Sequence, residues 1–316
     1  MDSILNTVVF PIIRQDMIIP ALESLRARTP ENFKTIVVCQ TVLQPEWLSE
    51  LYALSDLVIL THLNYGFAQA ANLGTRLAPT EFVTIANDDV VFLEGWWEGI
   101  AKTFQKYSNA VGVAPMSPKE PGWGYGEPGF RYHSIPDSSP ELTELLRDYE
   151  KMRTQISSGG LTARERLIEF EQEIDQLMLD QLTEATSLKD LVEKHRGSVI
   201  DGIAMWLVVF KREPWVNLGM FDERFVPGGG EDYDSCWRCY HAGYRAIASS
   251  LSWVWHYWGR SKDRADGFQR ALPLARPQWN KLSTKGFGEE GLYDPDVDVW
   301  GRTGERTDPR VFRAPL

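Results

Sequence analysis

The sequence has few cysteines, no long apolar run and a deficit of positive charge, and each shortage argues against a class of protein. Three cysteines in 316 residues are too few for a disulfide framework, so we expect free thiols and a cytoplasmic location. No stretch reaches the roughly 18 to 20 apolar residues that a transmembrane helix needs. The formal net charge of -11 and the pI near 5.1 argue against a surface that coats nucleic acid broadly, because phosphate contacts need clustered Lys and Arg.

Hydrophobic residues, by contrast, are plentiful. They make up 43% of the chain, which is enough for one large α/β domain carrying an insertion. Twelve tryptophans are many for this length. Aromatic rings can stack on sugars, but buried aromatics are more often core, and we expect most of these to be core.

Short apolar runs alternate with helical patterns along the first third of the chain. This alternation is typical of a parallel sheet covered on both faces. The expected strands are 7–13, 33–39, 57–60 and 81–86, and the expected helices are 18–27, 45–54 and the alanine-rich segment that follows Gly66. Further along we expect a helix at 95–107, a strand at 110–114 and a loop at 117–129. The α/β pattern then resumes at 200–210, followed by a helix at 231–240 and a strand at 247–255.

The segment 140–196 has a different composition, rich in Glu, Leu, Arg and Gln. Apolar residues recur at helical spacing, including Leu142, Leu145 and Tyr149, and the pattern breaks at 157–160. We interpret the segment as an inserted antiparallel helical hairpin. A solvated excursion or a contact between copies of the chain is the simpler interpretation, ahead of a direct chemical role.

Ligand-type side chains recur where apolar strands end or helices begin. Asn87-Asp88-Asp89 follows a strand, Glu231-Asp232 opens a helix, and His256 ends the last strand. In open α/β sheets, ligands gather at the carboxyl ends of strands. Divalent ions such as Mg2+ and Mn2+ bind one or two carboxylates plus substrate phosphates, and Mn2+ tolerates His. Each group alone has a structural explanation, as a turn, a helix cap or a buried histidine.

Together these motifs resemble the family 2 glycosyltransferases of the GT-A fold, particularly rhamnosyltransferase-like members. The resemblance covers roughly 5–132 and 198–260. It depends on Asn64-x-Gly66-Phe67-Ala68-x-Ala70-x-Asn72-x-Gly74, on Asn87-Asp88-Asp89, on Gly229-Gly230-Glu231-Asp232-Tyr233-Asp234 with Arg238, and on His256. It implies an α/β Rossmann-like fold with a mostly parallel central sheet flanked by helices, interrupted here by the helical hairpin. The expected parts are a nucleotide-sugar-binding half (1–132), the hairpin (133–197), an acceptor and catalytic half (198–260) and a C-terminal tail packed on the core (261–316).

The resemblance also implies an inverting transfer from a nucleoside-diphosphate sugar to a hydroxyl group, with Mn2+ or Mg2+ as cofactor. It implies that Asp89 binds the metal and that Asp88 helps to hold metal or ribose. His256 matches a position that completes the metal site in some relatives. Asp232 is the expected catalytic base, with Glu231 the next candidate, because an acceptor hydroxyl must lose its proton as it attacks. Asn87 stands where many relatives have Asp, so we expect it to make a neutral hydrogen bond.

The donor contacts are expected to come from the early strands and the Gly-Phe-Ala helix. Relatives usually have an acidic residue after the second strand that binds the nucleotide base, whereas this chain has Gln40, an amide that can still bond a base edge. Uridine, thymidine and guanosine donors therefore all remain open. The donor-contact candidates are Pro11, Arg14, Gln40, Asn64, Gly66, Phe67, Asn72, Asn87 and Asp88; Arg14 and Arg260 are proposed for the diphosphate by their charge.

The acceptor is not determined by these residues. A glycan or lipid-linked glycan is the default, and a modified base in DNA, as in phage-type enzymes, is the alternative. The DNA acceptor needs a basic groove, for which Lys102, Lys106, Lys119, Arg131 and the hairpin arginines are the available residues. A non-catalytic sugar-nucleotide-binding protein is a further alternative, and the hairpin is a candidate contact between copies of the chain. Cys236, Cys239 and His241 suggest zinc, but no fourth ligand lies near them in the sequence.

Overall fold

The computed structural model describes residues 6–14, 17–30, 32–61, 63–121, 130–132, 138–155, 161–182, 189, 192–195, 199–201, 203–226 and 228–258. The expected C-terminal tail at 261–316, Arg260 and the expected hairpin break at 157–160 lie outside these residues. None of the described helices combines the length and the apolar character needed to cross a membrane.

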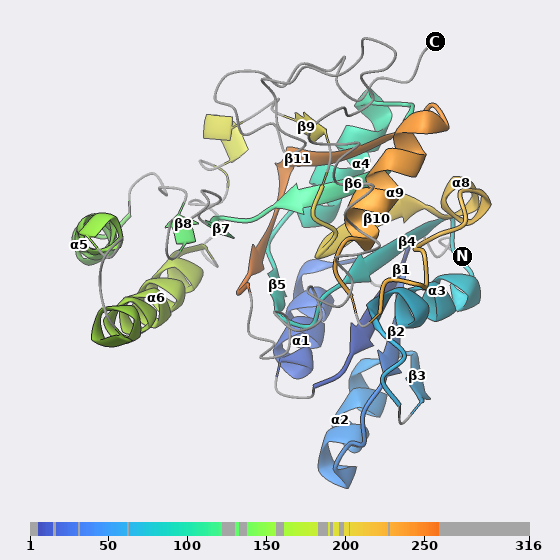
Figure 1. Ribbon diagram of the computed structural model, residues 1–316, viewed down its shortest axis with the longest axis horizontal. Coiled ribbons are helices and arrows are strands. Elements are labelled where there is room, and N and C mark those ends of the chain that lie inside the picture. The colour runs from blue at the N-terminus through green and yellow to red at the C-terminus, as the bar shows by residue number, and fades with distance from the viewer. Residues whose placement is uncertain are drawn as a thin grey trace.

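Nine strands of the described chain form one sheet with helices on both faces (Figure 1). The sheet has the order β3-β2-β1-β4-β10-β6-β11-β5, and β9 also pairs with β11. The expected α/β fold is confirmed. Its strands are β1 (Asn6–Ile12), β2 (Phe33–Cys39), β3 (Leu57–Leu60), β4 (Phe82–Ala86), β5 (Val90–Phe92), β6 (Ala110–Met116), β9 (Val199–Asp201), β10 (Leu207–Lys211) and β11 (Arg245–His256).

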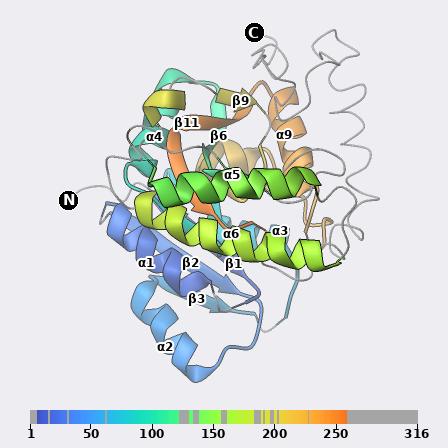
Figure 2. The same cartoon turned by 90° about the vertical axis from the view of Figure 1, so that its left-hand side faces the viewer.

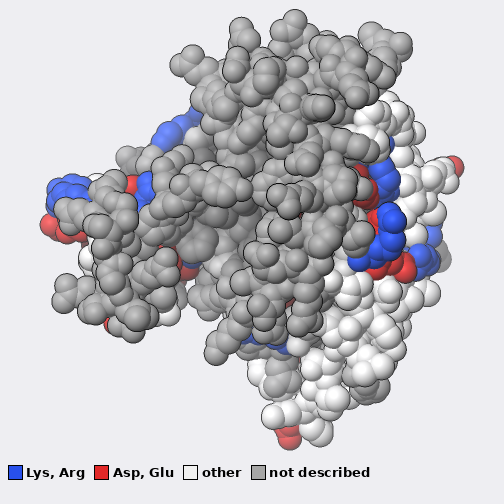
Figure 3. Space-filling view, in the orientation of Figure 1, with Lys and Arg blue, Asp and Glu red and all other residues white. Residues whose placement is uncertain are grey.

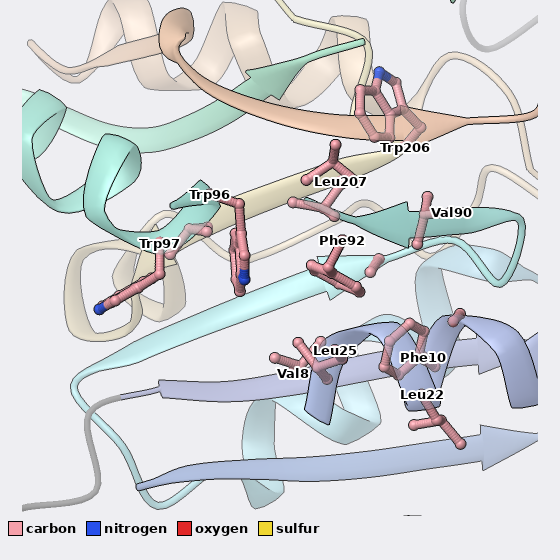
Figure 4. Packing of buried hydrophobic residues seen from close by; sticks show 14 of the residues in the cluster. Val8, Phe10, Leu22, Leu25, Val90, Phe92, Trp96, Trp97, Trp206 and Leu207 are labelled. Atoms are coloured by element: carbon pink, nitrogen blue, oxygen red, sulfur yellow. The ribbon is translucent and has the colours of Figure 1, made fainter. Parts of the chain in front are cut away.

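Alternate residues of β1 enter two different cores, which is how one strand supports helices on both faces. Val8 and Phe10 pack with α1 (Ile18–Arg28), α2 (Pro45–Leu54) and α4 (Trp96–Lys106), as the close-up in Figure 4 shows in part. Val9 packs on the other face with α3 (Phe67–Leu77), α8 (Arg212–Asn217) and α9 (Glu231–His241).

Helix α3 approaches the sheet closely because its facing residues are small. A Cβ atom on Gly74 would lie 2.2 Å from a methyl carbon of Val9, so only glycine fits at this crossing. The expected tight packing of the Gly-Phe-Ala helix is therefore present.

The two halves of the sheet differ in strand direction. Strands β3, β2, β1 and β4 are parallel, as the alternating pattern predicts, and β6 and β11 are also parallel. Strand β10 is antiparallel to both β4 and β6, and β5 and β9 are antiparallel to β11. The second half is thus assembled from segments that are distant in sequence.

The α/β pattern expected to resume at 200–210 contains two strands, since β9 pairs with β11 whereas β10 lies between β4 and β6. One sequence prediction is wrong in detail. The segment 117–129, expected to be a loop throughout, contains β7 (Lys119–Pro121), which pairs with β8 (Phe130–Tyr132). Strands of three residues are too short to show the alternation that a sequence pattern requires.

The predicted helical hairpin is present as α5 (Pro140–Gln155) and α6 (Leu161–Leu182), which contact each other. It stands at one side of the sheet in Figure 1, and Figure 2 shows its two helices running alongside each other. Its apolar side packs on the end of β11 in a third core that includes Leu142, Ile174, Met178, Trp253 and Trp255. The domain boundaries given above, and a contact between copies through the hairpin, stay predictions.

Candidate functional site

Asp89 and His256 lie side by side because a short strand that the sequence pattern did not reveal joins their two segments. After β4 the chain passes through Asn87 to Asp89 and enters β5, where Val90 pairs antiparallel with His256 of β11. The backbone N–H of Tyr257 continues this ladder by donating to the Asp89 carbonyl at 3.0 Å. The side chains then meet, with Asp89 Oδ1 2.9 Å from His256 Nε2.

Aromatic rings enclose this pair. His256 is 1% exposed and Asp89 is 7% exposed. The His256 ring stacks on Trp206 at a centroid distance of 4.6 Å and lies against Trp258 at 4.2 Å. The Trp206 carbonyl also accepts a hydrogen bond from the Asn87 N–H at 2.7 Å. Sequence reasoning missed Trp206, because nothing near position 206 in the chain indicates that it packs on His256.

The donor atoms of this pair suit a divalent metal ion. One carboxylate oxygen and one imidazole nitrogen face each other, and the nitrogen favours Mn2+ over the oxygen-preferring Mg2+. No group of three or more His, Cys, Asp or Glu side chains within the described ranges is arranged to hold a metal. Half-buried Asp88 precedes Asp89 in the chain.

The acidic turn at the start of α9 contains both cap residues and the candidate base. Gly228, Gly229 and Gly230 all have positive φ and bring the chain into the helix. The Glu231 carboxylate accepts a hydrogen bond from the Gly229 N–H, so it closes this turn. Asp232, the second residue of the helix, is half-buried.

Asp234 and Arg238 form a structural pair one turn apart in α9. Arg238 Nε donates to Asp234 at 2.7 Å, and its other nitrogens donate to the carbonyls of Leu218 at 2.6 Å and Met220 at 2.5 Å. The motif residue Arg238 therefore ties α9 to the segment before the glycine turn.

Segment 203–206 connects α9 to the Asp89–His256 pair. The backbone N–H of Ile203 donates to Cys236 Sγ of α9 at 3.4 Å, and three residues later Trp206 packs on His256. Segment 203–206 thus contacts both helix α9 and the Asp89–His256 pair. The catalytic roles of Glu231 and Asp232 stay predictions.

Gln40 and Asn64 fix the loop that begins α3. Gln40 is 4% exposed, and its Oε1 accepts a hydrogen bond from the Tyr65 N–H at 2.9 Å. Asn64 Oδ1 accepts one from the Gly66 N–H at 2.9 Å, and Gly66 has a φ of 100°. These contacts place the loop at the carboxyl ends of β2 and β3.

Asn72 and Phe67 hold a different segment. Asn72 is 1% exposed, and its amide exchanges hydrogen bonds of 2.8 and 3.1 Å with the backbone of Phe221. Its nitrogen also donates to Glu223 at 3.0 Å, and the Phe67 ring packs edge-on against Phe221. This arrangement favours a structural role for Asn72 over the predicted donor contact.

The remaining donor-contact candidates lie at the end of β1. Pro11 pairs with Val38 in the ladder to β2, and Arg14 follows two residues after the strand and is half-buried. Both lie at the same edge of the sheet as the end of β4, because β1 and β4 are parallel neighbours.

The three cysteines are free and buried. Burial raises the pKa of Cys239 to about 12, which keeps its thiol protonated at neutral pH. A protonated thiol is a poor metal ligand. Cys236 and Cys239 pack in the core between α9 and the sheet, which favours a structural role over zinc binding.

Lys119, counted above toward a basic groove, does not lie on the surface. It is 2% exposed and forms an ion pair of 2.7 Å with Asp175. The side chain of Arg131 lies outside the described residues. On the face shown in Figure 3, the described Lys and Arg lie beside Asp and Glu. No groove lined by described Lys and Arg alone is visible on this face.

Similar folds are found among solved glycosyltransferases. GalNAc-T7, solved with UDP, GalNAc and Mn2+, has a TM-score of 0.53 and 13% identity, covering 86% of this chain and 48% of that one. The mannosyltransferase PcManGT from Pyrobaculum calidifontis, solved with GDP-Man and Mn2+, has a TM-score of 0.48 and 14% identity, covering 82% and 59%. S. aureus TarS 1–349 has a TM-score of 0.49 and 11% identity, covering 87% and 65%. The chain thus spans less than two thirds of each of these solved chains.

A search of curated protein sequences returned no match. The model of the family described as "Glycosyl transferase family 2" matches residues 7–168, just over half of the chain. The matched region includes the Gly-Phe-Ala helix and Asn87-Asp88-Asp89, two of the motifs on which the sequence resemblance depends. With a GT-A-like fold and a family match of this extent, the chain belongs to glycosyl transferase family 2.

Proposed function

We propose that this protein is a metal-dependent, inverting glycosyltransferase that moves a sugar from a nucleoside-diphosphate sugar to a hydroxyl acceptor. The observation that carries the proposal is the Asp89–His256 pair, which the β5–β11 ladder fixes at the end of β4. The solved structure of GalNAc-T7, which has a similar fold, contains UDP and Mn2+ and supports the same class of donor and metal here.

In this proposal Asp89 and His256 bind the metal, and Asp88 contacts metal or ribose. A divalent ion held there supplies positive charge to the departing diphosphate. Trp206 and Trp258 keep water from the His256 ring and hold its plane, because they pack on it. The Asn87 backbone N–H donates to the Trp206 carbonyl, and the uncharged Asn87 side chain is assigned a neutral hydrogen bond to the donor.

Asp232 is the proposed base, which takes the proton of the acceptor hydroxyl as that oxygen attacks the anomeric carbon. The sugar–diphosphate bond breaks as the new glycosidic bond forms on the opposite face, so the configuration inverts. Half-burial at the first turn of α9 suits this role, because a base must reach a bound acceptor yet lie near the reacting centre.

A glycan or lipid-linked glycan is the preferred acceptor class. A DNA acceptor would need a basic groove, whereas the chain has a net charge of -11 and buries Lys119 in an ion pair. The cytoplasmic location stays a prediction from the sequence.

Donor hydrolysis tests the proposal directly. The protein is incubated with UDP-, dTDP- and GDP-sugars and Mn2+, and the released nucleoside diphosphate is measured. Turnover of at least one donor is expected, and Asp89→Ala should abolish it. Glu94→Ala, which removes an exposed carboxylate paired with Arg28, is the matched control and should retain activity. Binding of a donor without any turnover would favour a non-catalytic sugar-nucleotide-binding protein.

A further inference from the structure

A buried ion pair joins the helical hairpin to the segment beside the candidate metal site. Lys119 Nζ of β7 lies 2.7 Å from Asp175 Oδ2 of α6, and both residues are at most 5% exposed. The hydroxyl of Tyr132 in β8 donates to the other Asp175 oxygen at 3.0 Å. One carboxylate of the hairpin therefore holds both strands of the β7–β8 ribbon.

The ribbon needs such an anchor. Lys119 pairs with Tyr132 across strands of three residues each, and a short isolated hairpin of strands is marginally stable. Asp175 supplies a charged hydrogen bond to Lys119, which is stronger than a neutral one. The Lys119 side chain is thus held by a residue that belongs to the insertion, while its backbone N–H donates to Ser117 Oγ at 3.3 Å.

The Lys119 backbone in turn contacts the tryptophan that packs on His256. Trp258 Nε1 donates to the Lys119 carbonyl at 2.6 Å, and the centroid of the Trp258 ring lies 4.2 Å from that of the His256 ring. Trp258 has a φ of 58°, a left-handed conformation that bulky residues rarely adopt without surrounding contacts that hold them. The hydrogen bond to Lys119 is one such contact.

We propose that Asp175 and Lys119 are positioning residues, through which the inserted hairpin fixes Trp258 and thereby the His256 ring in its orientation toward Asp89. Asp175 and Lys119 are not metal ligands and do not touch the reacting atoms in this scheme. The inference rests on the proposed function, because it assigns the hairpin a role in the same metal site.

Mn2+ binding is the first test. Free Mn2+ is measured by its EPR signal during titration of the protein with MnCl2 in the presence of UDP. Asp175→Asn and Lys119→Met should each raise the Mn2+ dissociation constant by at least about tenfold, the size of effect known for groups that orient a metal ligand. Lys151→Met is the matched control, because it removes a lysine from an exposed hairpin ion pair with Asp148 and should leave Mn2+ binding unchanged.

A double variant keeps the test decisive if the single variants do not fold. Lys119→Met combined with Asp175→Leu removes both charges of this ion pair, and such replacements often preserve folding. The double variant should also bind Mn2+ at least about tenfold more weakly than the unaltered protein, because the ribbon has lost the same anchor. Native Mn2+ affinity in a folded double variant would overturn the proposal and leave the pair a purely structural device.

The imidazole signals of His256 give a second measurement that needs no metal. They are recorded by long-range 1H–15N NMR on the full chain and assigned by their loss in His256→Gln. Asp175→Asn, or the double variant, should shift them, whereas Lys151→Met should not. If the unaltered protein binds no Mn2+, the metal part of the proposed function fails, and the His256 signals still decide the inference. Unshifted His256 signals in a folded Asp175→Asn or double variant would contradict it.

Discussion

The end of β4 and the base of the hairpin each bury one carboxylate against one nitrogen group, yet the two pairs are built differently. Asp89 and His256 meet through a backbone ladder, and the half-buried Asp88 precedes Asp89 in the chain. Lys119 and Asp175 meet through side chains alone, and the second carboxylate oxygen is bound by Tyr132. An imidazole can ligate a metal, whereas an ammonium group cannot. The first pair is therefore suited to a ligand and the second to holding structure.

The largest effect is expected at Asp232, the proposed base. Asp232→Asn should lower kcat of donor-to-acceptor transfer by about 10²- to 10⁴-fold, because a neutral amide cannot take the hydroxyl proton. Steady-state kinetics with the donor identified by hydrolysis measure this loss. A larger loss in Glu231→Gln than in Asp232→Asn would move the catalytic role to Glu231, whose contact with Gly229 predicts mainly a structural effect.

At the hairpin we expect a substitution in the Lys119–Asp175 pair to lower the free energy of unfolding. Lys119→Met leaves the Asp175 carboxylate buried without its cation, which costs about 3–5 kcal/mol in comparable cases. Urea unfolding followed by circular dichroism measures the change in the free energy of unfolding. Asp89→Asn is the counterpart at the candidate metal site and should stay within about 1.5 kcal/mol of the unaltered protein, because an amide still hydrogen-bonds to His256. Equal losses in the two variants would remove the distinction between the pairs.

Replacement of His256 tests whether the Asp89–His256 pair binds a metal ion. His256→Gln should weaken Mn2+ binding by about 10- to 100-fold, since groups that merely orient a metal ligand already have effects of this size. Isothermal titration with MnCl2 measures the affinity, and circular dichroism checks that the fold is retained. His195→Gln is the matched control, because His195 packs on Trp253 at the hairpin side of β11. Unchanged affinity in His256→Gln would mean that the imidazole does not bind the metal.

The smallest effect is expected at Glu223, a carboxylate at the protein surface. The Asn72 amide and then Arg76 hold the pKa of Glu223 below its ordinary value. Ionised Glu223 therefore stabilises the folded protein fully at pH values above the unfolded pKa of about 4.3. This stabilisation is lost as the pH falls through the lower pKa of Glu223 in the folded protein. Glu223→Gln should cost at most about 1 kcal/mol at pH 7, as for exposed ion pairs, and this difference should shrink below pH 4. Thermal unfolding from pH 7 to pH 3 measures both, and a difference that grows with acid would contradict the assignment.

Local patterns predict the first half of the sheet well. Strands β1 to β4 each follow a helix or lead into one within a few residues, so their alternation is visible in the sequence. The positions of Asp89 and His256 at strand ends follow from the same patterns. The contact between them does not, because β5 is only three residues long and its partner lies far along the chain.

Contacts made by side chains far apart in sequence could not be predicted. Lys119 reads as a surface lysine, and only the folded hairpin brings Asp175 to it, 56 residues away. Trp206 and Asn72 likewise take their roles from the segments that pack on them, His256 in one case and Phe221 in the other. Residue type and spacing indicate candidate chemistry, whereas the supporting contacts are set by packing.

The place of β11 in the sheet has a consequence during synthesis of the protein. It is the last described strand to leave the ribosome, and it must enter between β6 and β5, because it pairs with both. Asp89 and His256 are 167 residues apart, so at typical translation rates the carboxylate waits roughly ten to thirty seconds for its imidazole. A nascent chain that lacks β11 therefore has Asp89 but not the His256 beside it, and the proposed metal site is complete only when the last described strand has joined the sheet.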